Sequence, residues 1–251
     1  RLPGGRIDAR GMRAVADAAR HHGNGIIELT SRASLQIRGI RGDIAPILQQ
    51  AGLLPSLTHE RVRNILASPY AGPEVDATVA ELDELLCADP ELANLSGRHL
   101  FAVDDGTGLH AHAADITVGP GEAEQAIKAA RQRRRIPGLV PTAQPRVGKR
   151  TLLAPLARLT PEQMGALAEL DEIRIAANRT ITVRQTPPDI GLIDDPGSGW
   201  VGLTACAGLG ACNKAEFDVR AHAAARAAER GPGAPREHHA ACERNCGALH
   251  T

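Results

Sequence analysis

The stretch ELTSRASLQIRG, residues 28–39, decides the fold class of this chain. Residues 25–30 and 34–40 are predicted to be two short strands, because the second alternates apolar and polar positions and a polar turn separates them. Asp8 precedes an amphipathic segment and is predicted to cap a helix over 9–22, whose apolar face holds Met12. The expected unit is therefore a helix followed by two strands.

The second half of the sequence repeats this unit. Thr160 is an expected N-cap with proline at the first helical position, opening a helix to about residue 170. Strands are predicted over 172–175 and 180–184. Met164 matches Met12, and Asn178-Arg179-Thr180 matches Ser31-Arg32-Ala33. A unit used twice implies an internal pseudo-twofold axis, with a site between the halves.

The remaining segments add further helices and strands, which makes the fold class α+β. The basic run at residues 131–135 is interpreted as a solvated helix end, and Gly119-Pro120-Gly121 lacks the lysine and the context of a phosphate loop. Further helices are predicted over 43–51, 74–87, 121–134 and 212–229, and strands over 99–104 and 113–118, separated by the turn Asp104-Asp105-Gly106.

The composition restricts the class of protein. The 251 residues carry 29 basic and 29 acidic side chains, so nothing global favours nucleic acid or an anionic membrane as a partner. There is no run of about 18 apolar residues, and no secretory signal is visible. The first residues read as the middle of a protein, and a missing C-terminal piece is also expected. Five cysteines without a signal predict a reducing cytoplasm.

Four cysteines lie in the last fifth of the chain. They form C-x5-C and C-x3-C pairs with 29 residues between them: Cys206, Cys212, Cys242 and Cys246. Four thiolates favour an iron–sulfur cluster, and a helix beginning at Cys212 would stabilise its thiolate. The alternatives are a structural zinc site, for which C-x5-C is wide, or unrelated buried thiols. Cys87, alone on a predicted helix, is expected in the core.

Four arginines occur beside turns or strand ends, namely Arg1, Arg32, Arg63 and Arg98. Guanidinium groups bind carboxylates through paired hydrogen bonds, so several that converge on one cavity would suit a polycarboxylate ligand. The alternative for each of them is a surface ion pair. The ten histidines, including His110 and His112, lack the spacing of an iron site and are expected to be surface or core residues.

Together these motifs resemble the nitrite/sulfite reductase superfamily. The resemblance rests on RLPGG at residues 1–5, ELTSRASLQIRG, the two cysteine pairs and CERNCG at residues 242–247. It implies a [4Fe-4S] cluster on the four cysteines and a tetrapyrrole held by arginines between pseudo-twofold halves. The implied domains are a first ferredoxin-like half at 1–55, a first nitrite/sulfite reductase-like domain at 56–135, a second ferredoxin-like half at 136–190 and a truncated cluster-binding segment at 191–251.

Within the superfamily, the segment LSGRHLFAVDDG at residues 95–106 is most similar to the precorrin-3B synthase branch. Arg98 and Leu100 stand where sulfite and nitrite reductases usually carry lysines that help bind and protonate the anion. The resemblance implies a precorrin-type tetrapyrrole substrate, O2, an electron donor (NADH or a reductase) and a further mononuclear non-haem iron. It implies that Arg1, Arg32, Arg63 and Arg98 hold substrate carboxylates, with Gln36 close by.

Other functions remain open at this stage. The chain could be a sirohaem-dependent nitrite or sulfite reductase, a non-catalytic iron–sulfur electron carrier or an inactive fragment. The carrier is disfavoured by the length of the chain and by the set of arginines, since simple ferredoxins need neither.

Overall fold

Strands from both halves of the chain build the centre of the molecule. The computed structural model describes residues 1–108, 114–138 and 145–247. One antiparallel sheet has the order β1 (Arg6–Asp8), β9 (Glu172–Ile175), β10 (Thr180–Val183) and β7 (Thr151–Leu153). The other has the order β3 (Leu35–Ile37), β2 (Ile27–Leu29) and β8 (Arg158–Leu159). The halves thus exchange strands, since β1 pairs with β9 and β8 pairs with β2.

Two capped helices pack against each other over these sheets. Helix α1 (Ala9–His21) begins at Asp8, whose side chain accepts a hydrogen bond from the Gly11 amide at 2.7 Å. Helix α5 (Pro161–Leu167) begins with the capping box of Thr160 and Gln163. Met12 and Met164, each four residues after its cap, are fully buried in one core. The prediction of an internal repeat is therefore confirmed for these helices.

The correspondence between the turns is shifted by one residue from the predicted one. The Thr30 amide donates to the Ser34 carbonyl, and the Ala176 amide donates to the Thr180 carbonyl. Ala33 (φ 50°) and Arg179 (φ 66°) hold the same left-handed position. Arg32 therefore corresponds to Asn178, and the predicted match of Arg32 to Arg179 was wrong, because sequence similarity alone did not fix where the backbone turns.

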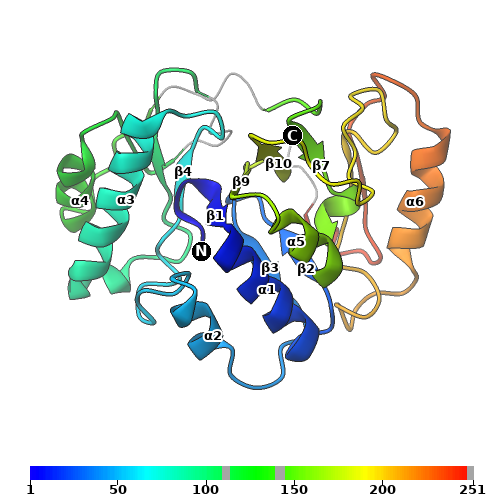
Figure 1. Cartoon of the computed structure of the whole chain (residues 1–251), viewed down its shortest axis with the longest axis horizontal. Helices are drawn as coiled ribbons and strands as arrows, with labels where there is room; N and C mark the ends of the chain where they lie inside the picture. The colour runs from blue at the N-terminus through cyan, green and yellow to red at the C-terminus, as the bar shows by residue number, and fades with distance from the viewer. Residues whose placement is uncertain (109–113, 139–144, 248–251) are drawn as a thin grey trace.

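A well-packed α/β unit lies beside the central sheets. Its strands β4 (Ile65–Ala67), β5 (Phe101–Val103) and β6 (Ile116–Val118) are parallel and fully buried. Helices α3 (Pro73–Ala88) and α4 (Ala123–Arg131) cover them at one end of the molecule (Figure 1). β5 and β6 are parallel, so they do not form a hairpin. The predicted turn after β5 is present, since the Gly106 amide donates to the Asp104 carboxylate at 3.1 Å. Residue 113, the first of the predicted second strand, lies outside the described residues.

A second α/β unit lies at the opposite end of the molecule. It consists of the parallel strands β11 (Leu203–Ala205) and β12 (Glu237–His239), joined through helix α6 (Val219–Glu229) (Figure 1). The prediction that this helix starts at residue 212 was wrong. Asp218 caps the helix by accepting hydrogen bonds from the amides of Arg220 and Ala221, so residues 212–218 form turns before it.

The other elements depart from prediction mainly at their ends. Helix α2 (Ala45–Gln50) and the predicted strands around residues 27 and 35 are shorter than expected, whereas β9 has its predicted bounds. Short 3-10 turns, Pro3–Gly5 and Pro155–Ala157, precede β1 and β8 and extend the repeat. None of the helices in the described part of the chain has the length and apolar character that crossing a bilayer requires.

Candidate functional site

Cys206 and the residue before Cys242 lie together at the carboxyl ends of β11 and β12. Cys206 follows β11 directly, and its amide donates to the His239 carbonyl at 2.9 Å. The Ala241 amide, next to Cys242, donates to the Cys206 sulfur at 3.3 Å. Because parallel strands end at the same edge of a sheet, the two cysteine-bearing loops lie together there.

The other two cysteines lie in turns tied to the same edge. The Lys214 amide donates to the Cys212 sulfur at 3.4 Å, and the Glu216 amide donates to the Ala241 carbonyl at 3.0 Å. The Cys246 carbonyl is 3.1 Å from a ring nitrogen of His238 on β12. The four thiol-bearing segments therefore form one connected group of loops, which we call the cysteine loops (residues 206–216 and 241–246).

The donor set of the cysteine loops fits an iron–sulfur cluster. All four thiols are free, three are half-buried and Cys246 is exposed. Amides that donate to sulfur, as at Cys206 and Cys212, are among the groups that tune such clusters. In the described residues no three His, Cys, Asp or Glu side chains are already arranged to hold a metal ion. Closing a cluster would thus require the thiols to draw together, and the ligand assignment stays a prediction.

Three of the four predicted arginines converge on one region. Arg32 donates to the Gly97 carbonyl at 2.5 Å, which places it beside the turn that carries Arg98. Burial and then the positive charges of Arg1 and Arg98 lower the pKa of Arg32, while Asp115 opposes them. The Nε of Arg1 is buried without a hydrogen-bond partner. A ligand carboxylate would relieve this excess of positive charge.

Arg63 has a structural role here. It is buried, and its guanidinium donates to both carboxylate oxygens of Asp83 at 2.7 Å and to the Leu53 carbonyl. Glu60 accepts a further hydrogen bond. Ion pairing outweighs burial and holds the pKa of Arg63 above its ordinary value. The predicted contact of Arg63 with a substrate carboxylate is therefore not supported by its geometry.

Gln36 lies on β3 opposite Glu28 of β2, with its side chain exposed. Around Glu28 the structure assembles arginines that the sequence did not single out. Arg38, Arg158 and Arg220 all donate to its carboxylate. Arg38 lies ten residues from Glu28, but Arg158 and Arg220 lie 130 and 192 residues away, so no local signal could have identified these two.

Leu100 provides no ammonium group at the position where nitrite and sulfite reductases usually carry a lysine. It is 8% exposed and belongs to an apolar cluster with Ala33 and Ala177, which lie in the two equivalent turns of the repeat. Arg98 is exposed on the turn that precedes β5. The apolar cluster of Leu100, Ala33 and Ala177 thus lies close to the charged side chains of Arg32 and Arg98.

Several other candidates do not contribute to this site. Cys87 is half-buried, and burial raises the pKa of its thiol. The Gly121 amide donates to Thr78, which leaves it structural and not part of a phosphate loop. Within the basic run, Arg131 pairs with Asp89. His110 and His112 lie outside the described residues.

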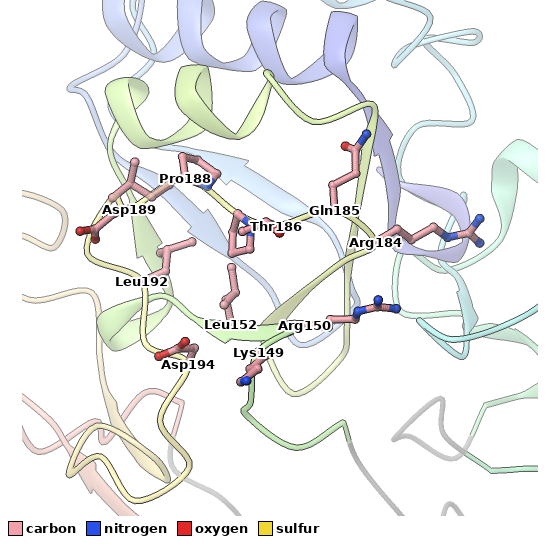
Figure 2. A pocket seen from close by; sticks show the side chains of 12 residues that line it. Lys149, Arg150, Leu152, Arg184, Gln185, Thr186, Pro188, Asp189, Leu192 and Asp194 are labelled. Carbon is pink, nitrogen blue, oxygen red and sulfur yellow. The ribbon is translucent and has the colours of Figure 1, made fainter.

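A separate cavity of about 510 Å³ lies beside β7 and the end of β10. Lys149, Arg150 and Arg184 supply positive charge there, and Leu152 and Leu192 lie in its middle (Figure 2). It contains none of the residues predicted to bind substrate or cluster.

Comparison with known proteins agrees with this architecture. Residues 1–52 match the model of the nitrite/sulfite reductase ferredoxin-like half domain. A ferredoxin–nitrite reductase of Leptolyngbya laminosa is 29% identical over 138 residues, which cover 48% of this chain and 27% of that protein. The chain therefore spans about a quarter of that relative.

Among solved structures, the NirA protein of Mycobacterium tuberculosis is similar with a TM-score of 0.69 and 14% identity. The match covers 91% of this chain and 63% of NirA, and at this identity it establishes the fold alone. The ferredoxin-like half domain and the partial match to a nitrite reductase support a relationship of the chain to the nitrite/sulfite reductases, and the match to NirA shows a shared fold.

Proposed function

We propose that the chain is an iron–sulfur oxidoreductase that acts on a tetrapyrrole. The observation that carries the proposal is the cysteine loops: four free thiols on connected segments at the carboxyl ends of two parallel strands. Cys206, Cys212, Cys242 and Cys246 would hold a [4Fe-4S] cluster, which supplies one-electron chemistry that side chains lack.

The arginines of the first half would bind the tetrapyrrole carboxylates. The positive charges of Arg1 and Arg98 act on Arg32, which is partly withdrawn from water. Such desolvated guanidinium groups gain more from a carboxylate than exposed ones. Gln36, exposed on β3, would add a hydrogen bond from its neutral amide to the tetrapyrrole. Arg63 is left out of this set because Asp83 already occupies its guanidinium.

The finer proposal is a precorrin-3B synthase-type monooxygenase of cobalamin biosynthesis. Its substrate would be precorrin-3A, hydroxylated on the macrocycle with formation of a lactone. One oxygen atom of O2 would enter the product and the other would leave as water, with two electrons from an external donor. Leu100 favours this reaction over anion reduction, because its buried position offers neither charge nor proton to nitrite or sulfite.

A sirohaem-dependent nitrite or sulfite reductase is the second candidate, favoured by the match to a ferredoxin–nitrite reductase. One preparation separates the two. After anaerobic reconstitution with iron and sulfide, a broad cluster absorption without tetrapyrrole bands, followed by hydroxylated product from precorrin-3A and O2, supports the synthase. Sirohaem that stays bound, together with nitrite or sulfite turnover, contradicts it.

Substitution of Arg32 tests the binding region directly. Arg32→Ala should weaken tetrapyrrole binding by about 1.5–3 kcal/mol, the value of a hydrogen bond to a charged group. Arg20→Ala is the matched control, because the ion pairs of Arg20 with Asp17 on α1 and Glu162 on α5 are exposed. Fluorescence quenching by the bound macrocycle would give both affinities. Equal affinities for the two variants would return Arg32 to a structural role.

A further inference from the structure

The carboxylate of Glu28 lies at the centre of a group of arginines. Its side chain is 13% exposed on β2. One oxygen accepts hydrogen bonds from Arg38 of the neighbouring strand, at 2.7 Å from Nε. The other accepts from Arg158 on β8 at 2.9 Å and from Arg220 on α6 at 3.4 Å. The central sheet and the second α/β unit thus share one carboxylate.

Two of these arginines also reach the same atom in the cysteine loops. Arg158 donates through Nη2 to the Ala207 carbonyl at 2.6 Å, and Arg220 donates through Nε to it at 3.4 Å. Ala207 directly follows Cys206 in the chain. Arg158 and Arg220 therefore bridge the same pair of acceptors, Glu28 and the Ala207 carbonyl, from two different elements. We call this group the Glu28 bridge (Glu28, Arg158 and Arg220).

The charges of the Glu28 bridge do not balance. Burial and then the charge of Arg158 lower the pKa of Arg220 to about 10, while Glu28 and Cys206 act in the opposite direction. Burial would raise the pKa of Glu28, but hydrogen bonds from Arg38 and Arg158 outweigh it and hold the pKa below its ordinary value. One carboxylate thus faces two guanidinium groups of the bridge and a third from Arg38, which leaves positive charge beside the cysteine loops.

We infer that Arg158 and Arg220 are positioning residues that fix the peptide after Cys206 and raise the reduction potential of the cluster. The inference rests on the proposed function, because it requires a cluster on the cysteine loops. Two donors on one carbonyl restrict the rotation of the Cys206–Ala207 peptide and thereby the direction of the cysteine side chain. Reduction adds one negative charge to the cluster, and a nearby guanidinium stabilises the reduced state more than the oxidised state.

The charge effect predicts shifts of opposite sign for two members of the bridge. Arg220→Gln removes positive charge and should make the potential more negative, while Glu28→Gln removes negative charge and should make it more positive. We expect about a tenfold change in the ratio of reduced to oxidised cluster in each, which is 59 mV for a one-electron couple. Arg220→Lys keeps the charge but loses the two-acceptor geometry and should retain much of the wild-type potential.

The experiment is an EPR-monitored redox titration of the reconstituted 251-residue chain, with iron and sulfide analysis of each variant. Arg20→Gln is the control for loss of one arginine, because it lies in exposed ion pairs of the helices. Loss of iron in Arg220→Gln that Arg220→Lys restores also supports the inference. If Arg220→Gln does not fold, the sign of the Glu28→Gln shift decides, since general loosening would not raise the potential.

Two results overturn the inference and separate it from the proposed function. Wild-type potential with full iron content in both Arg220→Gln and Glu28→Gln would refute the bridge while leaving the cluster in place. Shifts of the same sign in both would do the same. A wild-type chain that binds no cluster at all would refute the proposed function and this inference together.

Discussion

The two α/β units at opposite ends of the molecule have the same strand–helix–strand topology but different interiors. In the first, β4, β5 and β6 are fully buried, and α3 contributes buried leucines such as Leu82. In the second, β12 is half-buried along its length, and the core consists of Leu203, Ala223 and Ala227 with a few partly buried neighbours. The first unit can be stabilised by apolar packing, whereas the second cannot rely on it.

Polar contacts occupy the place of a core in the second unit. The side chain of Arg230 is fully buried and donates to the carbonyls of Gly199, Val201 and Pro235. Arg226 pairs with Glu237 across α6 and β12. Small units of this kind commonly depend on a metal site for stability. The predicted cluster would therefore contribute to folding of the second unit as well as to electron transfer.

The largest effect is expected from removal of a cluster ligand. Cys242→Ser should abolish the cluster and with it the amide protection of β11, α6 and β12, whereas the first unit should keep its protection. Hydrogen exchange with mass spectrometry resolves the two units in one experiment, and Cys87→Ser is the matched control. Full iron content in Cys242→Ser would refute its assignment as a ligand.

The next largest effect is expected on the unfolding free energy of the first unit. Leu82→Ala deletes a fully buried side chain from α3 and should cost about 2–5 kcal/mol of unfolding free energy. Exchange of α3 and β5 amides should accelerate, while that of α6 should change little. Denaturant unfolding followed by exchange measures both units. Equal acceleration in the two units would contradict their separate stabilisation, because it would mean that they unfold as one.

In the second unit, the substitution comparable to Leu82→Ala is removal of the buried side chain of Arg230. Arg230→Ala leaves three carbonyls without this donor and removes one of the ion pairs of Glu237, and we expect a cost of about 3 kcal/mol confined to this unit. Arg226→Ala is the control, since its pair with Glu237 is 40% exposed on the arginine side and exposed pairs contribute about 0–1 kcal/mol. A larger effect for Arg226→Ala would mean that the surface pair, not the buried guanidinium, holds the unit.

A smaller effect should appear on acidification. The hydrogen bond from Arg226 lowers the pKa of Glu237 below its ordinary value of 4.5. Because the folded pKa is depressed, Glu237 stabilises the second unit above pH 4.5, and this contribution is lost as the pH falls through the lower, folded pKa. Exchange of α6 amides, corrected for intrinsic rates, should accelerate in that window. Glu237→Gln should abolish the step; an unchanged step would assign it to another group.

The sequence predicted those parts of the fold that local patterns encode. Asp8 and Thr160 mark helix starts through their caps, and the matched methionines revealed the repeat. Strand β12 escaped prediction because Glu237-His238-His239 has no apolar residue. The start of helix α6 was predicted several residues too early, because residues 212–218 contain no glycine or proline that would mark a turn before Asp218.

The site was predictable only in part, because only some of its residues belong to a local sequence pattern. Cysteine spacing is a property of the sequence, so the four thiols were found without the structure. The Glu28 bridge joins residues separated by 130 and 192 positions, and only the folded chain brings them together. The ion pair of Arg63 was not foreseen because its partner Asp83 lies 20 residues away on α3, and no motif links the two.

The central claim is that the second unit holds an iron–sulfur cluster on its cysteine loops. The most direct measurement is iron and acid-labile sulfide per chain after anaerobic reconstitution, with the EPR spectrum of the reduced protein. We expect about four iron and four sulfide per chain and the signal of a reduced [4Fe-4S] cluster. Tight binding of a single zinc ion, with no sulfide and no paramagnetic signal, would contradict it.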